Sequence, residues 1–317
     1  MTGNTRRGVA AAVIGNGIFG FSFMFSRIAL AAATPFVMLM YRFGAAFLLL
    51  SLVALWAGRT QREGWLRFRL SGLGPLVLLG LCQPVCYFLC ESYGISLTNA
   101  TFSGVMIALI PIAALAAGRL FLGEKPTLPQ VCFALLSIAG VVVMTLQQSA
   151  QGEVKPLGIL LLLGAVASAV AFNLMSRKLS DQFSALERTW VMMLVGASVF
   201  AGLAVGRCGG DWQQLTVPLK TASFLWAILY LAGFSSVVAF LMLNYANTEL
   251  PVAKATIFCN VTTVISLLAG VIFLGEPFGW LQLLASVVIV IGVWGVQRQP
   301  DEAAGPQNGL RQEEQGL

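Results

Sequence analysis

The chain has 317 residues, of which 58% are hydrophobic and only 10% are charged, and its mean hydropathy is +0.84. So few charged side chains cannot cover the surface of a water-soluble globule of this length, which excludes a soluble enzyme or binding domain. The net charge of +6 does not indicate a nucleic-acid partner, because the basic residues lie in short loops between apolar runs rather than in one patch.

Apolar runs of about 20 residues follow one another along the chain, and this is the length that an α-helix needs to cross roughly 30 Å of hydrocarbon. None of the runs alternates between apolar and polar residues as the strands of a membrane β-barrel do. We therefore predict an all-α integral membrane protein with ten transmembrane helices. In chain order, the expected spans are residues 8–31, 36–57, 73–96, 100–122, 128–147, 157–177, 185–206, 221–244, 250–274 and 278–297.

The lysines and arginines orient these spans, since cytoplasmic loops retain positive charge. One side of the expected bundle receives Arg6, Arg7, Arg59, Arg62, Arg67, Arg69, Lys125, Arg177, Lys178 and Arg298, and the other receives only Arg27, Lys155, Arg207 and Lys220. We expect a multi-pass protein of the bacterial cytoplasmic (inner) membrane with both termini in the cytoplasm. Residues 298–317, rich in Gln, Glu and Gly, are expected to form a disordered cytoplasmic tail.

Two segments of the chain resemble each other closely. FLGEKPTLPQVCFALLSIAGVVVM, from Phe121 to Met144, aligns without gaps on FLGEPFGWLQLLASVVIVIGVWGV, from Phe273 to Val296. This similarity predicts two repeats of five helices each, at residues 8–148 and 156–297. Because five is an odd number, the second repeat has to enter the membrane from the side opposite to the first, and inverted repeats of this kind are typical of alternating access.

The sequence resembles the drug/metabolite transporter superfamily, in its ten-span branch with two EamA domains. The stretches that carry the resemblance are GFSFMFSRIAL (20–30), ESYGISLTNATFSGVMIALIPI (91–112) and the doubled LGE turn. The resemblance implies a secondary transporter with a central cavity between its halves, in a family whose members carry amino acids, other metabolites, quaternary amines or drugs. In the doubled turn, Glu124 and Glu276 are each expected to interact with the N-terminus of the helix that follows.

Glu91 is the first candidate for a functional group, because a charge inside a bilayer costs about 2.5–3.5 kcal/mol and usually faces the protein interior. Gln83 and Tyr87, eight and four residues earlier, extend it to a polar stripe on one helix face. Glu91 is expected to bind a substrate ammonium group or to carry a coupling proton, and a structural ion pair with Arg42 or Arg27 is the alternative. Arg42 is expected to fix the bundle through hydrogen bonds to carbonyl groups.

Further binding candidates lie on five other expected spans, where aromatic faces and amides would suit an ammonium-bearing solute. They are Asn16, Phe19, Phe23, Asn173, Trp190, Tyr230 and Asn260. For each of them a structural role stays open, namely packing between helices, anchoring at the membrane interface, or hydrogen bonding across helices.

We expect a secondary transporter for a small polar metabolite, such as an amino acid or a small organic cation, and the alternative is a multidrug or toxic-metabolite exporter. A facilitative channel is less favoured. A membrane-embedded lipid enzyme is also less favoured, because the sequence has no histidine and no cluster of acids, so no enzyme activity is expected. The thiols of Cys82, Cys86 and Cys90 share a helix face but are interpreted as packing groups. No metal or cofactor is expected, and we expect the protein to be a monomer in the bilayer that exchanges its solute, and potentially protons.

Overall fold

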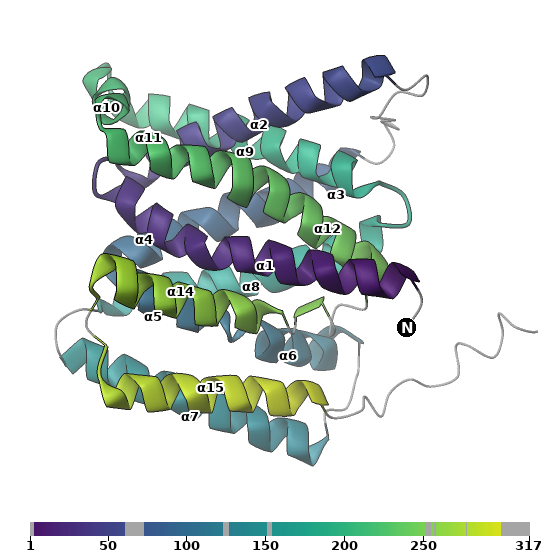
Figure 1. Ribbon diagram of the computed structural model, residues 1–317, viewed down its shortest axis with the longest axis vertical. Helices are drawn as coiled ribbons and strands as arrows, with labels where there is room; N and C mark the ends of the chain where they lie inside the picture. Colours follow the sequence, from purple (N-terminus) through teal and green to yellow (C-terminus); the bar gives the residue numbers. More distant parts are fainter. Residues whose placement is uncertain are drawn as a thin grey trace, which may run out of the picture.

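The computed structural model describes residues 3–60, 73–122, 127–150, 154–250, 255–256, 258–276 and 278–298, and within these ranges every regular element is a helix (Figure 1). This confirms the all-α class. The predicted tail at 298–317 lies outside the described residues except for Arg298, and so does Glu124.

The helices follow the expected spans closely. The first part of the chain forms α1 (Gly3–Leu30), α2 (Pro35–Thr60), α3 (Leu73–Gly80), η2 (Leu81–Cys86), α4 (Tyr87–Leu97), α5 (Ala100–Ile107), α6 (Ile110–Leu122) and α7 (Leu128–Ala150). The second part forms α8 (Pro156–Leu179), α9 (Ala185–Cys208), α10 (Gln213–Thr216), η3 (Val217–Lys220), α11 (Ala222–Leu229), η4 (Tyr230–Ala239), α12 (Phe240–Glu249), α14 (Cys259–Leu274) and α15 (Trp280–Arg298).

Three boundaries differ from the expectation. A turn at Ala108 and Leu109, which ends two residues before Pro111, separates α5 from α6 inside the span expected at 100–122. The span expected to end at residue 244 continues as α12 to Glu249. Of the span expected at 250–274, the described part is helical at residues 255–256 and then along α14.

Six helical segments of the described chain are long and apolar enough to cross a membrane. They are Thr5–Leu30, Pro35–Leu55, Leu73–Leu97, Pro156–Leu179, Ala185–Cys208 and Ala222–Glu249. Four shorter apolar helices accompany them, at Ala100–Ala114, Leu128–Met144, Cys259–Leu274 and Trp280–Gly292. These lengths indicate a multi-pass membrane protein. Each such helix satisfies its backbone hydrogen bonds internally and can therefore be surrounded by lipid without water.

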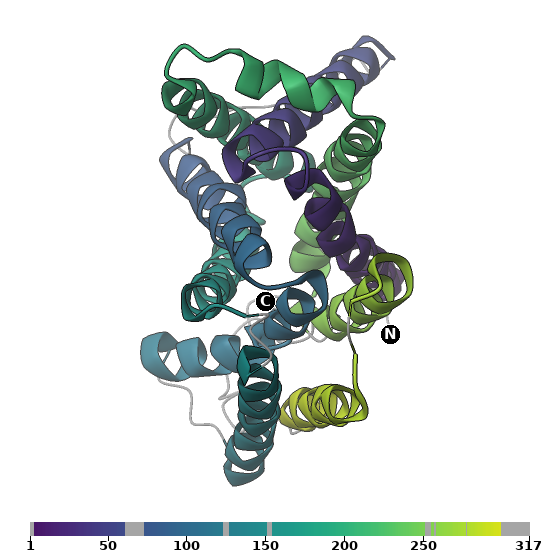
Figure 2. The ribbon, with the colours of Figure 1, turned by 90° about the vertical axis from the view of Figure 1, so that its left-hand side faces the viewer.

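The helices form a bundle with one pair standing apart. Helix α1 packs against α12 and α14, α4 packs against α8, and α5 crosses α14, so these helices enclose the centre of the molecule (Figures 1 and 2). Helix α2 packs against α9 on one flank. On the opposite flank α7 and α15 pack mainly against each other (Figure 1).

Glycines bring α7 and α15 into backbone contact. A Cβ atom added at Gly140 would lie 3.0 Å from the carbonyl oxygen of Ala285 and 3.3 Å from the backbone nitrogen of Ile289. On the other helix, a Cβ added at Gly292 would lie 2.7 Å from the Phe133 carbonyl oxygen and from the Ser137 nitrogen. Small residues at the crossing therefore allow the close approach on which helix association in a bilayer depends.

Two long spans depart from regular α-helical geometry, at a kink in η2 between α3 and α4 and at a π-helical segment, η4, between α11 and α12. In η2 the cause is Pro84, which has no N–H group and forces the residue before it out of helical geometry. Gln83 accordingly has φ −144° and ψ 115°. In η4, the hydroxyl groups of Ser235 and Ser236 accept hydrogen bonds from Arg42 of α2 at 2.8 and 3.0 Å. The arginine thus holds the bundle through serine hydroxyls and not through the expected carbonyl groups.

A buried arginine ties α8, α9 and α12 together near the end of the bundle that holds the N-terminus. Arg188 is fully buried and donates to the carbonyl oxygen of Ser176 at 2.6 Å and to that of Asn244 at 2.9 Å. It also donates to the hydroxyls of Ser176 and Thr248, and Asn244 donates to Thr189 at 3.0 Å. These bonds satisfy a charge that would otherwise be very costly to bury.

Candidate functional site

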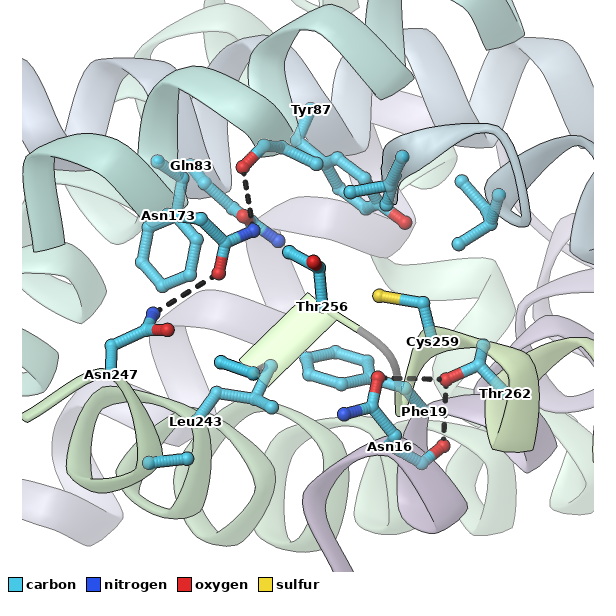
Figure 3. Close-up of a pocket in the computed structure, with 16 residues that line it drawn as sticks. Asn16, Phe19, Gln83, Tyr87, Asn173, Leu243, Asn247, Thr256, Cys259 and Thr262 are labelled. Carbon is cyan, nitrogen blue, oxygen red and sulfur yellow. Dashed lines mark hydrogen bonds between the residues drawn. The ribbon is translucent and has the colours of Figure 1, made fainter. Parts of the chain in front are cut away.

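A small cavity lies at the centre of the bundle, among α1, η2, α4, α5, α6, α8, α12 and α14 (Figure 3). Its volume is about 50 Å³. A cavity needs roughly 10–15 Å³ to hold one water molecule, whereas pockets for drug-sized ligands measure about 300–1,000 Å³. The cavity therefore has room for a few water molecules and not for a drug-sized ligand. The lining residues are Asn16, Phe19, Gln83, Tyr87, Ile107, Ile110, Ala169, Phe172, Asn173, Leu243, Ala246, Asn247, Ala255, Thr256, Cys259 and Thr262.

Five residues singled out from the sequence line this cavity. Asn16 and Phe19 come from α1, Gln83 from η2, Tyr87 from the start of α4, and Asn173 from α8. They are far apart in the sequence, yet the helices bring them to one place. Among the described lining residues there is neither an acid nor a lysine or arginine, so the polar lining consists of neutral amides, hydroxyls and a thiol.

The amides of the cavity are held in pairs that cross between helices. Asn247 of α12 donates to the side-chain oxygen of Asn173 on α8 at 3.1 Å, and Asn173 in turn donates to the carbonyl oxygen of Ala169 at 2.8 Å. On the other side of the cavity, the Thr262 hydroxyl donates to the side-chain oxygen of Asn16 at 3.1 Å (Figure 3). These bonds fix the orientation of the amides before any solute arrives.

Gln83 presents an acceptor that has no partner. Its side chain lines the cavity and is 5% exposed, and its Oε1 atom is buried without a hydrogen bond. The kink at Pro84 turns this residue out of the regular helix. A buried carbonyl oxygen without a donor is costly, so a solute that donates an N–H or O–H group there would recover the lost hydrogen bond.

Glu91 lies behind the cavity, not in its lining. Its carboxylate is 1% exposed, and Oε1 accepts a hydrogen bond from the hydroxyl of Tyr87 at 3.3 Å, while Oε2 has no partner. Within the described chain, neither expected arginine forms an ion pair with it. Arg42 binds the two serines of η4 with its guanidinium carbon 4.0 Å from the Phe88 ring centroid, and Arg27 donates to the Ile95 carbonyl oxygen at 3.0 Å.

Three predicted residues contact neighbouring helices away from the cavity. Phe23 is 1% exposed within the apolar core. The Trp190 indole donates to the Ser51 hydroxyl at 3.0 Å, and the Tyr230 hydroxyl donates to the Ile18 carbonyl oxygen at 2.9 Å.

Tyr230 also stacks with Phe25 and with Phe234, at centroid distances of 4.2 and 5.7 Å. Its ring is thereby occupied by aromatic neighbours and does not line the cavity. Asn260 does not line it either, although its side-chain oxygen is buried without a partner. For these positions a binding role stays a prediction.

The site includes residues that the sequence did not single out as binding candidates. Asn247 lies three residues beyond the predicted end of its span, which is why it was not considered. Thr262 lies two residues after Asn260, the candidate that the sequence did single out on the same helix. A signal for both existed in the sequence, since amides and hydroxyls inside long apolar helices usually hydrogen-bond to another helix.

Long apolar helices around a central cavity with polar lining from both parts of the chain are the architecture of a multi-pass membrane protein with a polar site inside its bundle. The sequence model of the EamA-like transporter family matches residues 6–146 and again residues 156–298. The chain belongs to this family, and it is a transporter and not an enzyme.

Known proteins of similar sequence and fold agree with this assignment. The chain is 32% identical to the uncharacterized transporter YcxC of Bacillus subtilis (strain 168), over 90% of this chain and 91% of YcxC. It is 22% identical to a probable terminal-alkyne amino-acid exporter of Streptantibioticus cattleyicolor, over 74% of this chain and 76% of the exporter. A solved crystal structure has the same fold with a TM-score of 0.66 and 18% identity, over 90% of this chain and 96% of that one.

Proposed function

We propose that this chain is a ten-span secondary transporter of the cytoplasmic membrane, built from two inverted five-helix repeats. It carries a small polar metabolite that bears an ammonium group, an amino acid or a small organic cation, by alternating access. The observation that carries this proposal is the central cavity, which takes Asn16, Gln83 and Tyr87 from one part of the chain and Asn173 and Asn247 from the other.

Contacts that recur at a constant separation support the inverted repeat. Gly140 meets Ala285 and Ile289, and Gly292 meets Phe133 and Ser137, so each residue of one contact lies 152 residues from its equivalent in the other.

The capping interactions of α7 and α15 recur at the same separation. Gln130 accepts a hydrogen bond from the Thr127 N–H at 2.7 Å, and Gln282 accepts one from the Gly279 N–H. The repeats proposed at 8–148 and 156–297 account for both sets of contacts. The distribution of lysine and arginine supports two cytoplasmic termini.

The lining of the cavity supports a solute with hydrogen-bond donors. Gln83 offers an unpartnered acceptor, and the rings of Phe19, Tyr87 and Phe172 offer faces that attract a cation. Glu91 adds a carboxylate one hydrogen bond behind the cavity, through Tyr87. Because no lysine or arginine lines the described cavity, nothing there would balance a solute with a net negative charge.

Within this class, amino acids are the first solutes to test, and export is the first direction of transport to test. The Streptantibioticus cattleyicolor relative, whose name describes an amino-acid exporter, supports this choice. The proposed mechanism requires the cavity to enlarge from its present volume of about 50 Å³, since even a small amino acid needs more room than a few water molecules.

A thermal-shift screen of the purified protein against amino acids, quaternary amines and polyamines tests the proposal. A solute that binds only the folded state stabilises it by about 2.7 kcal/mol at one hundred times its Kd. A hit is then followed by flux into proteoliposomes. We expect Gln83→Leu to weaken the shift and Gln213→Leu, an exposed glutamine outside the cavity, to leave it unchanged. Equal thermal shifts in the two variants would show that the solute does not bind at Gln83.

Glu91→Gln tests the role of the acid, because the amide keeps the shape of the side chain while removing its negative charge. We expect slower transport of a cationic solute or a changed dependence of transport on pH. Unaltered flux together with unaltered pH dependence would exclude both an ammonium-binding and a proton-carrying role.

A further inference from the structure

A second, larger hollow lies near the ends of α1, α4 and α14, at the end of the bundle opposite the N-terminus, which we call the distal end. This end of the helices is on the left side of Figure 1 and faces the viewer in Figure 2. Its volume is about 590 Å³. It is lined by Arg27, Ile28, Ala31, Thr98, Asn99, Ser223, Leu274, Gly275 and Glu276. Unlike the central cavity, it contains two charged side chains, and both bind the backbone around the turn between α4 and α5.

Glu276 binds the first N–H groups of α5. Its Oε1 atom accepts from the backbone nitrogen of Ala100 at 2.8 Å, and its Oε2 atom accepts from that of Thr101 at 2.7 Å. These N–H groups have no partner inside their own helix, and the helix dipole favours a carboxylate there. The sequence predicted instead that Glu276 would interact with the helix that follows it.

The geometry of the α14–α15 turn explains this difference. Gly275 ends α14 with φ +63°, a conformation that glycine adopts without strain, and this directs the next residue back toward α5. The N-terminus of α15 is capped by a side chain of the same helix, because Gln282 accepts a hydrogen bond from the N–H group of Gly279. The carboxylate of Glu276 therefore stays available for the other part of the chain.

Arg27 binds the same turn from its other side. It lies in the last turn of α1 and donates to the carbonyl oxygen of Ile95, near the C-terminal end of α4, at 3.0 Å. The C-terminus of a helix favours a cation, as its N-terminus favours an anion. Arg27 and Glu276 come from α1 and α14, which pack against each other, and they hold the α4–α5 turn, in which α4 packs mainly against α8.

The opposite end of the bundle carries an equivalent of the arginine contact. Arg177, in the last turn of α8, donates to the carbonyl oxygen of Asn247 at 3.1 Å and also to that of Thr248, near the end of α12. Ile95 and Asn247 lie 152 residues apart, the separation at which the other contacts recur. Here the arginine comes from the group of α4 and α8 and holds the group of α1, α12 and α14, so the roles of the two groups are exchanged.

We propose that Arg27 and Glu276, bound to the ends of α4 and α5, form a distal latch that has to open for the central cavity to reach the distal hollow, and that Arg177 closes the other end. This inference rests on the proposed alternating-access function. Both ends are latched in this structure, which fits the small volume of the cavity. A transporter of this kind opens one end while the other stays closed.

The experiment uses Cys259, a native thiol that lines the central cavity, as the reporter. The other five cysteines are replaced by alanine in the full-length protein. A charged, membrane-impermeant methanethiosulfonate is then added to one face of the membrane at a time, in cells and in inverted vesicles. The rate of Cys259 modification from each face is measured for Glu276→Gln, Arg27→Gln and Arg177→Gln.

We expect the two distal variants to speed modification from the distal face about tenfold without speeding it from the other face. That factor corresponds to ~1.4 kcal/mol, close to the lower limit of what a hydrogen bond to a charged group contributes. Arg177→Gln should do the opposite. Asp211→Asn is the control, since this exposed distal acid binds only Gln213 and Gln214 in its own turn, and it should change neither rate.

A merely structural role predicts a different pattern, in which modification rises equally from both faces as the melting temperature falls. That pattern, or unchanged rates in both distal variants, would overturn the latch. If Glu276→Gln does not fold, Arg27→Lys and Arg27→Gln provide the same comparison, with the modification rate of the lysine variant closer to that of the parent.

The latch and the proposed function can fail separately. A failure to transport any solute would refute the proposed function without changing the rates of Cys259 modification. A reversed membrane orientation would exchange the two faces for all variants together.

Discussion

Replacing Gly292 by alanine should separate α7 from α15. The added Cβ would lie 2.7 Å from the Phe133 carbonyl oxygen and the Ser137 nitrogen, about 0.7 Å inside the closest ordinary contact of about 3.4 Å. Both neighbouring atoms belong to the backbone and cannot rotate away, so the two helices have to move apart. Overpacking of this kind costs about 1–3 kcal/mol.

Gly44→Ala is the matched control, because a Cβ at this position of α2 meets no atom within 4 Å. There alanine should stabilise the helix by about 0.5–1 kcal/mol through its higher helix propensity. The two variants should therefore differ by about 1.5–4 kcal/mol. Thermal unfolding in detergent micelles, followed by tryptophan fluorescence, measures the difference. A Gly292→Ala protein that unfolds at or above the temperature of Gly44→Ala would refute the close backbone contact.

Two further substitutions test how the bundle is held together. Arg188→Met should lower the free energy of unfolding by about 1–3 kcal/mol, because it leaves buried carbonyl and hydroxyl groups without their donor. Thermal unfolding measures this loss, and Arg207→Met, which loses only an exposed contact with the Phe36 ring, is the comparison. Gly104→Ala places a Cβ against the side chain of Ser266 where α5 crosses α14, so it should cost about 1–3 kcal/mol. The double variant with Ser266→Gly should recover most of that loss, whereas additive losses would show that the two positions do not touch.

The positions of the helices were predictable because the bilayer imposes a length on each apolar run. Pro156 begins α8 one residue before the predicted start, and α9 begins at Ala185 as predicted. The serine before α9 forms a capping box with Glu187, a local pattern that can be read from sequence. The break between α5 and α6 was not predicted, because the apolar run continues through it.

The polar stripe of Gln83, Tyr87 and Glu91 was predicted as one feature, and the structure divides it. Two of its members line the cavity, while Glu91 lies behind Tyr87. Helical periodicity predicts the direction in which a side chain points, but it does not predict which side chains of the neighbouring helices lie in that direction. For the same reason, Trp190 and Tyr230 have the residue types of a binding site but contact Ser51 and Ile18 on adjacent helices.

The partners of Glu276 could not be predicted from the sequence around it. A carboxylate just after a glycine at a helix end normally suggests an interaction with the next helix, and the nearest N–H groups in sequence are those of α15. The actual donors, Ala100 and Thr101, precede it by about 175 residues. Only the packing of α5 against α14 makes this pairing possible, and that packing has no signature in either helix alone.

The glycine crossing of α7 and α15 also has a consequence for ancestry. Gly140 against Ala285 and Ile289, and Gly292 against Phe133 and Ser137, are the same contact made twice, as at the isologous interface of a two-fold symmetric dimer. The inverted repeat proposed above would explain this symmetry, because two copies of a five-helix unit paired in opposite orientations would make the contact twice. The two contacts now differ in detail, since one glycine faces isoleucine and the other faces serine.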